Sequence, residues 1–159
     1  MDRKQFIEHV ESNQRALRRF LTALCCGDSM LADDIAQDTL VKAYLSCHSF
    51  KEGGNFTNWI YKIAYNSFIS SRRKDKKHEP IAEAEKMGDE NAIDKAFEYQ
   101  ELYQALDQLS KKERTVTLLF YMQGYSVKEI ADITDSSSDA VRQQLSRARQ
   151  HLKNLLDDN

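Results

Sequence analysis

The sequence predicts an all-α protein, with two small helical domains joined by a flexible acidic linker. Apolar residues recur at helical spacing through most of the 159 residues, and runs of Val, Ile and Thr that would favour strands are absent. One proline and five glycines leave few positions that would break a helix. The linker is expected over residues 78–95, where acidic residues dominate, periodicity is weak and the only proline lies.

The first predicted domain, residues 1–77, begins with two helices. Amphipathic periodicity marks the first over residues 6–26. The Gly-Asp-Ser of residues 27–29 ends that helix and caps the second, which is expected over residues 30–47.

An acidic face on this second helix is a candidate binding site. Asp34 and Asp38 are one helical turn apart, as are Asp33 and Gln37. Like charges at that spacing cost roughly a few tenths of a kcal/mol in an isolated helix, which a basic partner would recover. A solvated acidic face is the alternative interpretation. No nearby His, Cys or third carboxylate completes an acid–base or metal site.

A loop and a third helix complete the domain and combine aromatic with basic residues. A glycine pair predicts the loop over residues 50–56, and the helix is expected to start at Thr57 or Asn58 and to run into the basic residues 72–77. Some of its aromatic side chains belong to a core. Others could stack on unpaired bases, at ~1–3 kcal/mol per base, beside cations that follow the nucleic-acid backbone.

The second predicted domain, residues 96–159, ends in a helix-turn-helix. A helix is expected over residues 96–109, and Ser110 begins another that Gly124 stops. Residues 125–156 then predict two helices around a polar turn, because apolar residues keep helical spacing on both sides of it.

The turn of this motif is expected over Thr134-Asp135-Ser136. Asp is among the few residues other than glycine that tolerate a left-handed backbone, so Asp135 suits the position. Ser137 or Ser138 can cap the next helix by accepting a free amide N–H of its first turn.

The last helix is predicted to read DNA. Between residues 140 and 153 it carries four basic residues and no acidic one. Arg pairs with guanine and Gln with adenine in the major groove, and Lys and Arg neutralise phosphate. A solvated basic face is the alternative. The predicted reading residues are Ser137, Ser138, Arg142, Gln143, Ser146, Arg147 and Arg149.

Composition disfavours other classes of protein. The net charge is −2, so the charge asymmetry is local. Cys25, Cys26 and Cys47 lack CxxC spacing, so reduced, buried thiols are expected rather than a metal site with His48. No signal peptide and no apolar run of ~20 residues is present, which predicts a cytoplasmic protein without a membrane span. Without a P-loop or metal triad, we expect neither an enzyme nor a cofactor.

The order of these features resembles one family. An acidic helix, an aromatic helix ending in basic residues, a variable linker and a terminal helix-turn-helix resemble the bacterial RNA polymerase sigma factors of the sigma-70 family, in particular the small extracytoplasmic-function group. Residues 32–44 are similar to that family's core-polymerase-binding helix, residues 50–66 to its promoter-melting segment, and residues 125–156 to its fourth region.

The resemblance implies a transcription initiation factor that binds core RNA polymerase and promoter DNA, recognises the promoter and melts it, with an anti-sigma factor as a further partner. It implies polymerase contacts for Asp33, Asp34, Gln37, Asp38 and Lys42. It implies contacts to the minus-ten element for Lys51, Asn55, Phe56, Trp59, Lys62, Asn66, Arg72 and Arg73. The last helix would read the minus-thirty-five element.

The chain departs from the family pattern at the helix-turn-helix. Asp135-Ser136 stand where the family often has glycine and an apolar residue, and Ser137-Ser138-Asp139 replace proline, a small apolar residue and glycine. A negative charge at Asp139 suits a helix N-terminus but repels phosphate. We therefore expect this chain to read a promoter sequence that is unusual for the family.

Two other functions are compatible with the helix-turn-helix. A stand-alone transcriptional regulator with an N-terminal dimerisation or sensor domain would bind a palindromic site tightly without polymerase. A DNA recombinase would need a nucleophile among basic residues. Ser70 and Ser71 are the only candidates, and no neighbouring residue supplies a base.

Overall fold

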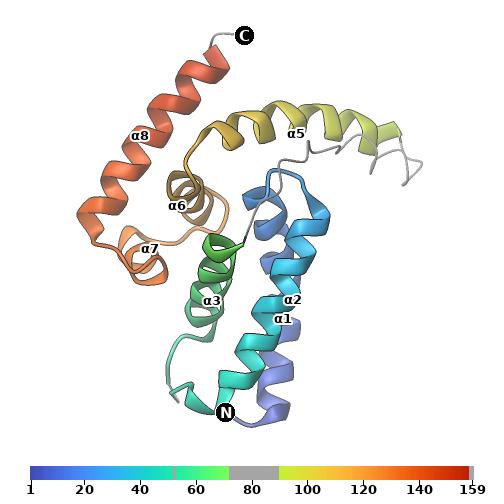
Figure 1. Cartoon of the computed structure of the whole chain (residues 1–159), viewed down its shortest axis with the longest axis vertical. Helices are drawn as coiled ribbons and strands as arrows, with labels where there is room; N and C mark the ends of the chain where they lie inside the picture. Colours follow the sequence, from blue (N-terminus) through green and yellow to red (C-terminus); the bar gives the residue numbers. More distant parts are fainter. Residues whose placement is uncertain (52, 72–89, 158–159) are drawn as a thin grey trace.

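The computed structural model describes residues 1–51, 53–71 and 90–157, and all regular secondary structure in these ranges is helical, as predicted (Figure 1). The first three helices form an N-terminal block: α1 (Arg3–Leu24), α2 (Ser29–Ser46) and α3 (Phe56–Ser70), with a short 3-10 turn at Cys47–Ser49. Helix α2 packs against both α1 and α3.

The break between α1 and α2 follows the predicted chemistry. Cys26 and Gly27 have positive φ angles of 54° and 88°, which turn the chain sharply. The Asp28 carboxylate then accepts the amide N–H of Leu31 at 3.1 Å and caps α2. Cys25 and Cys26 are buried and form no disulfide, while Cys47 is half-buried.

The C-terminal block contains α5 (Glu90–Gln108), α6 (Lys111–Tyr121), α7 (Val127–Ile133) and α8 (Ser138–Asp157). Helix α5 begins at Glu90, six residues before the predicted start, so it extends into the segment assigned to the linker. Glu, Ala and Lys in residues 90–95 are good helix formers, and acidic residues suit the first turn of a helix. Residues 78–89 of the predicted linker lie outside the described residues.

The helix-turn-helix has the predicted turn. Asp135 adopts the left-handed backbone with φ 51°, and the amide of Ser136 donates to the carbonyl of Ala131 at 2.9 Å. The Ser137 hydroxyl accepts the amide N–H of Ala140 at 3.1 Å and caps α8. The long helix α8 lies at the outer edge of the molecule (Figure 1).

Replacing Asp135 with valine is expected to destabilise the protein by about 1–3 kcal/mol, because a β-branched side chain is strained at positive φ. Asp135→Gly, which relieves that strain, is the matched control and should stay close to wild type. Chemical denaturation followed by circular dichroism measures the difference. Equal stability of the valine and glycine variants would contradict a left-handed residue in this turn.

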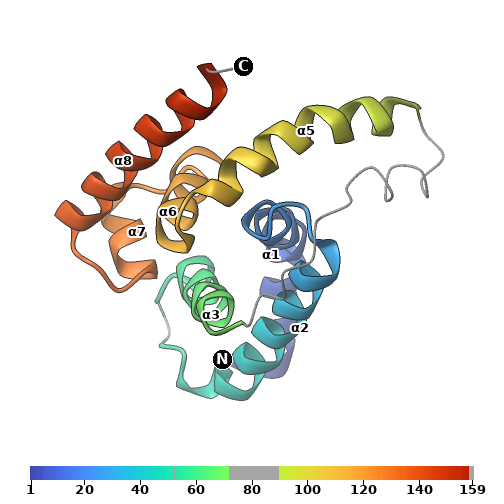
Figure 2. The same ribbon diagram turned by 45° about the horizontal axis from the view of Figure 1, so that its top comes forward.

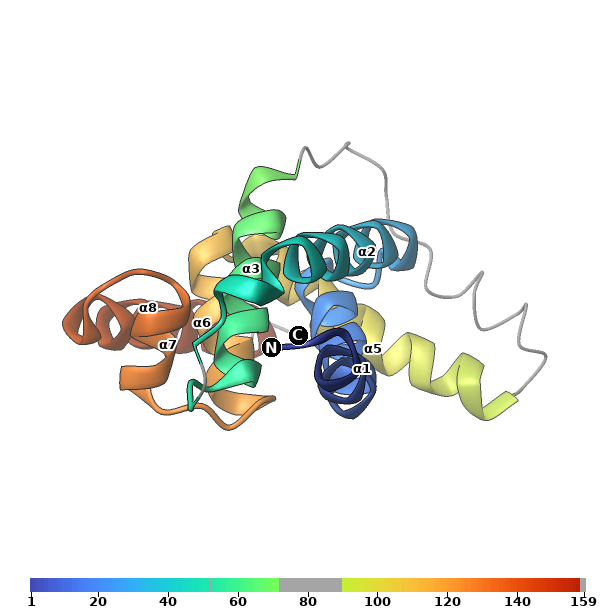
Figure 3. The same cartoon turned by 90° about the horizontal axis from the view of Figure 1, so that it is seen from below.

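The two blocks pack on each other around α6. Helix α6 contacts α1, and α3 contacts α7. The view from below shows α3 between α2 on one side and α6 and α7 on the other (Figure 3). Figure 2 shows α5 passing over the end of α1 and extending beyond it. The buried side chains of both blocks consequently form one continuous apolar cluster.

Candidate polymerase and DNA interfaces

The acidic face of α2 is exposed and internally ordered. The predicted polymerase-binding residues, Asp33, Asp34, Gln37, Asp38 and Lys42, are all exposed. Asp33 accepts hydrogen bonds from Arg18 of α1 at 2.5 Å and from the Gln37 amide at 2.9 Å. These bonds fix Asp33 and Gln37 on one side of the helix.

Asp38 is held at the junction of α2 and α3. Its carboxylate pairs with Lys42 at 2.8 Å, and Lys42 also donates to the Ser67 hydroxyl at 3.3 Å. The hydrogen bond from Lys42 keeps the pKa of Asp38 below its usual value. Asp38 therefore presents a fixed negative charge to any partner that covers α2.

The same face of α2 exposes apolar side chains that the sequence-based candidate set omits. Val41 and Leu45 follow Asp38 at helical spacing and are 57% and 67% exposed. The sequence could have indicated that Val41 and Leu45 are exposed, because they lie off the helical face that contains the buried positions Ile35, Thr39 and Ala43. Exposed apolar residues beside charges are typical of a protein-binding surface.

Only part of the predicted minus-ten set lies at the surface. Lys51, Asn55 and Asn66 are exposed, and Trp59 and Lys62 are half-buried. The Asn55 side chain caps α3 by accepting the amide N–H of Asn58 at 3.1 Å. Arg72 and Arg73 lie outside the described residues.

Phe56 is part of the core and is not presented for contact with a base. It is 5% exposed, and its ring stacks on His9 with centroids 4.7 Å apart and contacts Trp59 at 5.6 Å. Phe6 of α1 also packs on it edge to face at 6.2 Å. Phe56 thus anchors the start of α3 and supports the half-buried Trp59.

Helix α8, which the sequence predicts to read DNA, presents most of the predicted residues outward. Gln143, Ser146 and Arg147 are exposed, whereas Ser137 is occupied as the cap. Arg142 pairs with Asp139 at 2.8 Å. Asp139, one of the departures from the family pattern, therefore pairs directly with a predicted reading residue.

Arg149 is exposed, but its guanidinium contacts α6. Its Nε donates to the Tyr121 hydroxyl at 2.6 Å, and its guanidinium lies 5.8 Å and 5.7 Å from the ring centroids of Phe120 and Tyr121. These contacts occupy the guanidinium with cation–π and hydrogen-bonding partners. Arg149 consequently fixes α8 on α6 in this structure.

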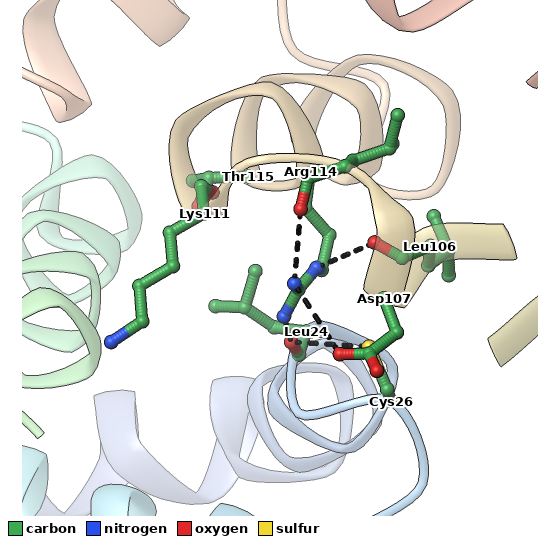
Figure 4. Close-up of polar contacts among 8 residues, drawn as sticks. Leu24, Cys26, Leu106, Asp107, Lys111, Arg114 and Thr115 are labelled. Atoms are coloured by element: carbon green, nitrogen blue, oxygen red, sulfur yellow. Dashed lines mark hydrogen bonds and ion pairs between the residues drawn. The ribbon is translucent and has the colours of Figure 1, made fainter. Parts of the chain in front are cut away.

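A buried arginine outside the predicted set joins three helices. Arg114 of α6 is 3% exposed and donates to the carbonyl oxygens of Leu106 at 2.9 Å, Leu24 at 2.9 Å and Leu109 at 3.2 Å. Asp107 lies 3.8 Å away (Figure 4). Through Leu24, this single side chain caps the C-terminus of α1 from the other block.

The described ranges contain no group of three His, Cys, Asp or Glu side chains that could hold a metal ion. Within the same ranges, no helix combines the length and apolar character needed to cross a bilayer.

Two family models match the two blocks. Residues 9–78 match sigma-70 region 2, and residues 99–152 match sigma-70 region 4. The chain is 31% identical over 143 residues to the ECF RNA polymerase sigma factor SigM of Bacillus subtilis strain 168, and the match covers 86% of each chain. It is 30% identical over 144 residues to EcfG of Rhodopseudomonas palustris strain TIE-1, covering 89% of this chain and 79% of EcfG.

The chain belongs to the extracytoplasmic-function group of RNA polymerase sigma factors. As a sigma factor it directs transcription initiation at promoters. Sigma factors are DNA-binding initiation factors and not, in general, enzymes.

Solved structures share the fold of this sigma factor. The sigma factor RpoE in complex with the anti-sigma factor NepR from Bartonella quintana superimposes with a TM-score of 0.74 at 24% identity, covering 97% of this chain and 98% of RpoE. CnrH in complex with the cytosolic domain of CnrY gives 0.75 at 24% identity, covering 99% and 91%.

Proposed function

We propose that this sigma factor binds core RNA polymerase through the exposed face of α2. The observation that supports this proposal is an exposed surface on which polar side chains are held in place beside apolar ones. Its polar residues are Asp33, Gln37 and Asp38, and its apolar residues are Val41 and Leu45. Asp34 and Lys42 complete this surface. The carboxylates fit a basic partner, and the apolar residues would add burial at ~25 cal/mol per Å².

Each of the two blocks then binds one element of the promoter. The surface formed by α3 and the loop before it captures the melted minus-ten element, aided by Arg72 and Arg73. The residues of this surface are Lys51, Asn55, Trp59, Lys62 and Asn66. Helix α8 reads the minus-thirty-five element through Arg142, Gln143, Ser146 and Arg147. Trapping an unstacked base supplies the energy for melting, without nucleotide hydrolysis.

This division assigns residues 1–77 to polymerase binding and minus-ten recognition and residues 96–159 to minus-thirty-five recognition. Each reader alone makes few phosphate contacts and binds weakly. Tethering both DNA-binding blocks to polymerase makes promoter binding multivalent. The affinity then depends on the effective concentration of the second block at its DNA element. The protein acts in the cytoplasm, where polymerase and DNA are found.

An anti-sigma factor is the proposed regulatory partner. The two related structures above are complexes with such factors. A groove of about 660 Å³ between α1, α5 and α6 offers a docking place, with apolar walls that include Leu102, Leu106 and Leu118. Arg18 and Arg19 lie on its lining, so the partner that fits is an amphipathic helix with acidic residues beside its apolar stripe.

Run-off transcription with purified core polymerase, with and without this chain, tests the function. Specific transcripts that need the chain are expected. If it neither co-purifies with core nor directs initiation, but binds a palindromic site by itself, the stand-alone regulator replaces the proposal.

Replacing Arg142 with alanine is expected to weaken recognition of the minus-thirty-five element by ~1–3 kcal/mol and to leave core binding unchanged. Asp139→Ala, which frees Arg142 from its ion pair, should act in the opposite direction. Run-off assays on promoters with intact and scrambled upstream elements measure both effects, with Arg15→Ala in α1 as the control. An equal loss on both promoters would exclude a role of Arg142 in sequence reading.

A further inference from the structure

We propose that Asp139 is a specificity-determining residue of α8, which selects the base next to a guanine that Arg142 contacts. The favoured base is cytosine, and bases that present only acceptors to the major groove are rejected. This inference rests on the proposed recognition of the minus-thirty-five element by α8. It adds a residue outside the predicted reading set and states which kind of base this residue selects.

Asp139 lies on the outward face of α8. The helix buries one stripe of side chains, which consists of Val141, Leu145 and Ala148. Two residues correspond to about 200° around a helix, so Asp139 points away from Val141. Gln143 and Ser146 follow Asp139 at i+4 and i+7 and are exposed as well. Asp139 therefore shares one exposed face with two of the predicted reading residues.

The Asp139 carboxylate is paired with Arg142 while both remain accessible. Its Oδ1 accepts a hydrogen bond from Nη1 of Arg142 at 2.8 Å, and the two side chains are 90% and 63% exposed. The cap of α8 is supplied by Ser137, whose hydroxyl accepts the amide N–H of Ala140. A guanidinium has five N–H donors, and this bond uses one of them. Arg142 can therefore contact a guanine and stay paired with Asp139.

The pair lies at the end of α8 that is suited to contact bases. In helix-turn-helix proteins the N-terminal residues of the second helix contact base edges. Asp139 and Arg142 belong to the first two turns of α8, at the end that follows α7 (Figure 1). Three residues advance a helix by about 4.5 Å, which is comparable with the step of about 3.4 Å between base pairs. The two side chains are therefore spaced to contact neighbouring base pairs.

A carboxylate and a guanidinium select opposite kinds of base edge. Arginine donates to O6 and N7 of guanine, whereas an ionised carboxylate only accepts hydrogen bonds. Cytosine presents an amino group at N4 and adenine one at N6, but guanine and thymine present acceptors. Asp139 therefore stabilises cytosine, tolerates adenine and repels guanine and thymine. The selectivity arises from the rejected bases as well as from the favoured one.

Base selection separates this role of Asp139 from a structural one. A carboxylate in the first turn of a helix also interacts favourably with the helix dipole, but that interaction requires no particular base. Exposed ion pairs contribute little to folding, so replacing Asp139 should leave the fold intact. A change in the selected base is thus a readout that a purely structural role would not move.

The test uses the full chain bound to core RNA polymerase and a promoter library randomised over the upstream element. Sequencing of the bound DNA gives the frequency of each base at each position. Arg142→Ala identifies the guanine, because the enrichment of that guanine is lost in this variant. In the wild type we expect cytosine, followed by adenine, at one neighbouring position, with guanine and thymine depleted about tenfold there.

Asp139→Asn keeps an oxygen that can accept from Arg142 but adds an amide donor. All four bases should then be accepted at the neighbouring position, while the guanine is retained. Asp139→Ala should lose the same selectivity and bind DNA more tightly overall, because a charge that repels phosphate is removed. Asp132→Ala removes the same charge from an exposed position of α7 and is the control that should keep the wild-type preference.

Unchanged base frequencies in Asp139→Asn would overturn the inference, as would guanine or thymine as the wild-type preference at the position that responds to Asp139. If the wild type shows no base preference that Arg142→Ala removes, α8 does not read the upstream element, and the proposed function of α8 fails together with the inference. The guanine distinguishes these failures, because it persists in the first case and is absent in the second.

Discussion

Asp38→Arg is expected to abolish binding to core RNA polymerase. The substitution replaces a carboxylate held in place by Lys42 with a second cation beside Lys42. A basic partner that fits the acidic face of α2 would meet like charges, and such a juxtaposition costs several kcal/mol at an interface. Since the carboxylate is half exposed and its ion pair contributes little to folding, the variant should fold normally.

Co-elution with core polymerase in gel filtration measures this effect, and circular dichroism checks the fold. Asp157→Arg makes the same change of charge at the exposed end of α8 and is the matched control. Retained co-elution of Asp38→Arg would move the polymerase-binding surface away from α2. Loss in both variants would instead indicate a non-specific effect of net charge.

Arg114→Met is expected to lower the free energy of unfolding by about 3 kcal/mol. Methionine fills a similar volume, but the carbonyl oxygens of Leu24, Leu106 and Leu109 lose the guanidinium donor, although that of Leu106 keeps the amide N–H of Leu109. Unsatisfied buried acceptors each cost about 1–3 kcal/mol. The ends of α1 and α5 are expected to fray first, because these carbonyls lie there.

Urea denaturation of the full chain measures the loss of stability. Lys112→Met changes the neighbouring exposed position and should have little effect. Arg114→Lys, with one ammonium in place of a forked guanidinium, should fall between the two. If Arg114→Met were as stable as wild type, the buried hydrogen bonds would not be a source of stability.

Features set by neighbouring residues in the chain were predictable. The cap at Asp28, the left-handed turn at Asp135 and the cap at Ser137 each depend on residues within four positions. Short polar residues next to amphipathic periodicity therefore sufficed to locate them. The exposure of the acidic face of α2 followed from periodicity in the same way.

Features that depend on a distant partner were not predictable. Phe56 belongs to the core because Phe6 and His9 come from α1, far away in the sequence. Arg149 faces α6 because the rings of Phe120 and Tyr121 lie beneath it. Periodicity places a side chain on a face of its own helix but does not say which element covers that face.

Arg114 shows the same limit for a buried charge. From the sequence alone, a charged residue in α6 is predicted to face solvent, since arginine is rarely buried without partners. Its partners here are backbone carbonyls at the ends of two other helices, which leave no trace in side-chain composition. Only the packing of α1 and α5 around α6 brings those carbonyls within reach.

The ion pair between Asp139 and Arg142 also bears on how promoter binding responds to ionic strength. Binding to DNA releases counterions in proportion to the number of phosphates that protein cations neutralise. An arginine already balanced by a carboxylate on the preceding helical turn releases fewer of these counterions. If α8 reads the upstream element as proposed, its binding is expected to be less sensitive to salt than its count of arginines suggests, with a larger share from contacts with base edges.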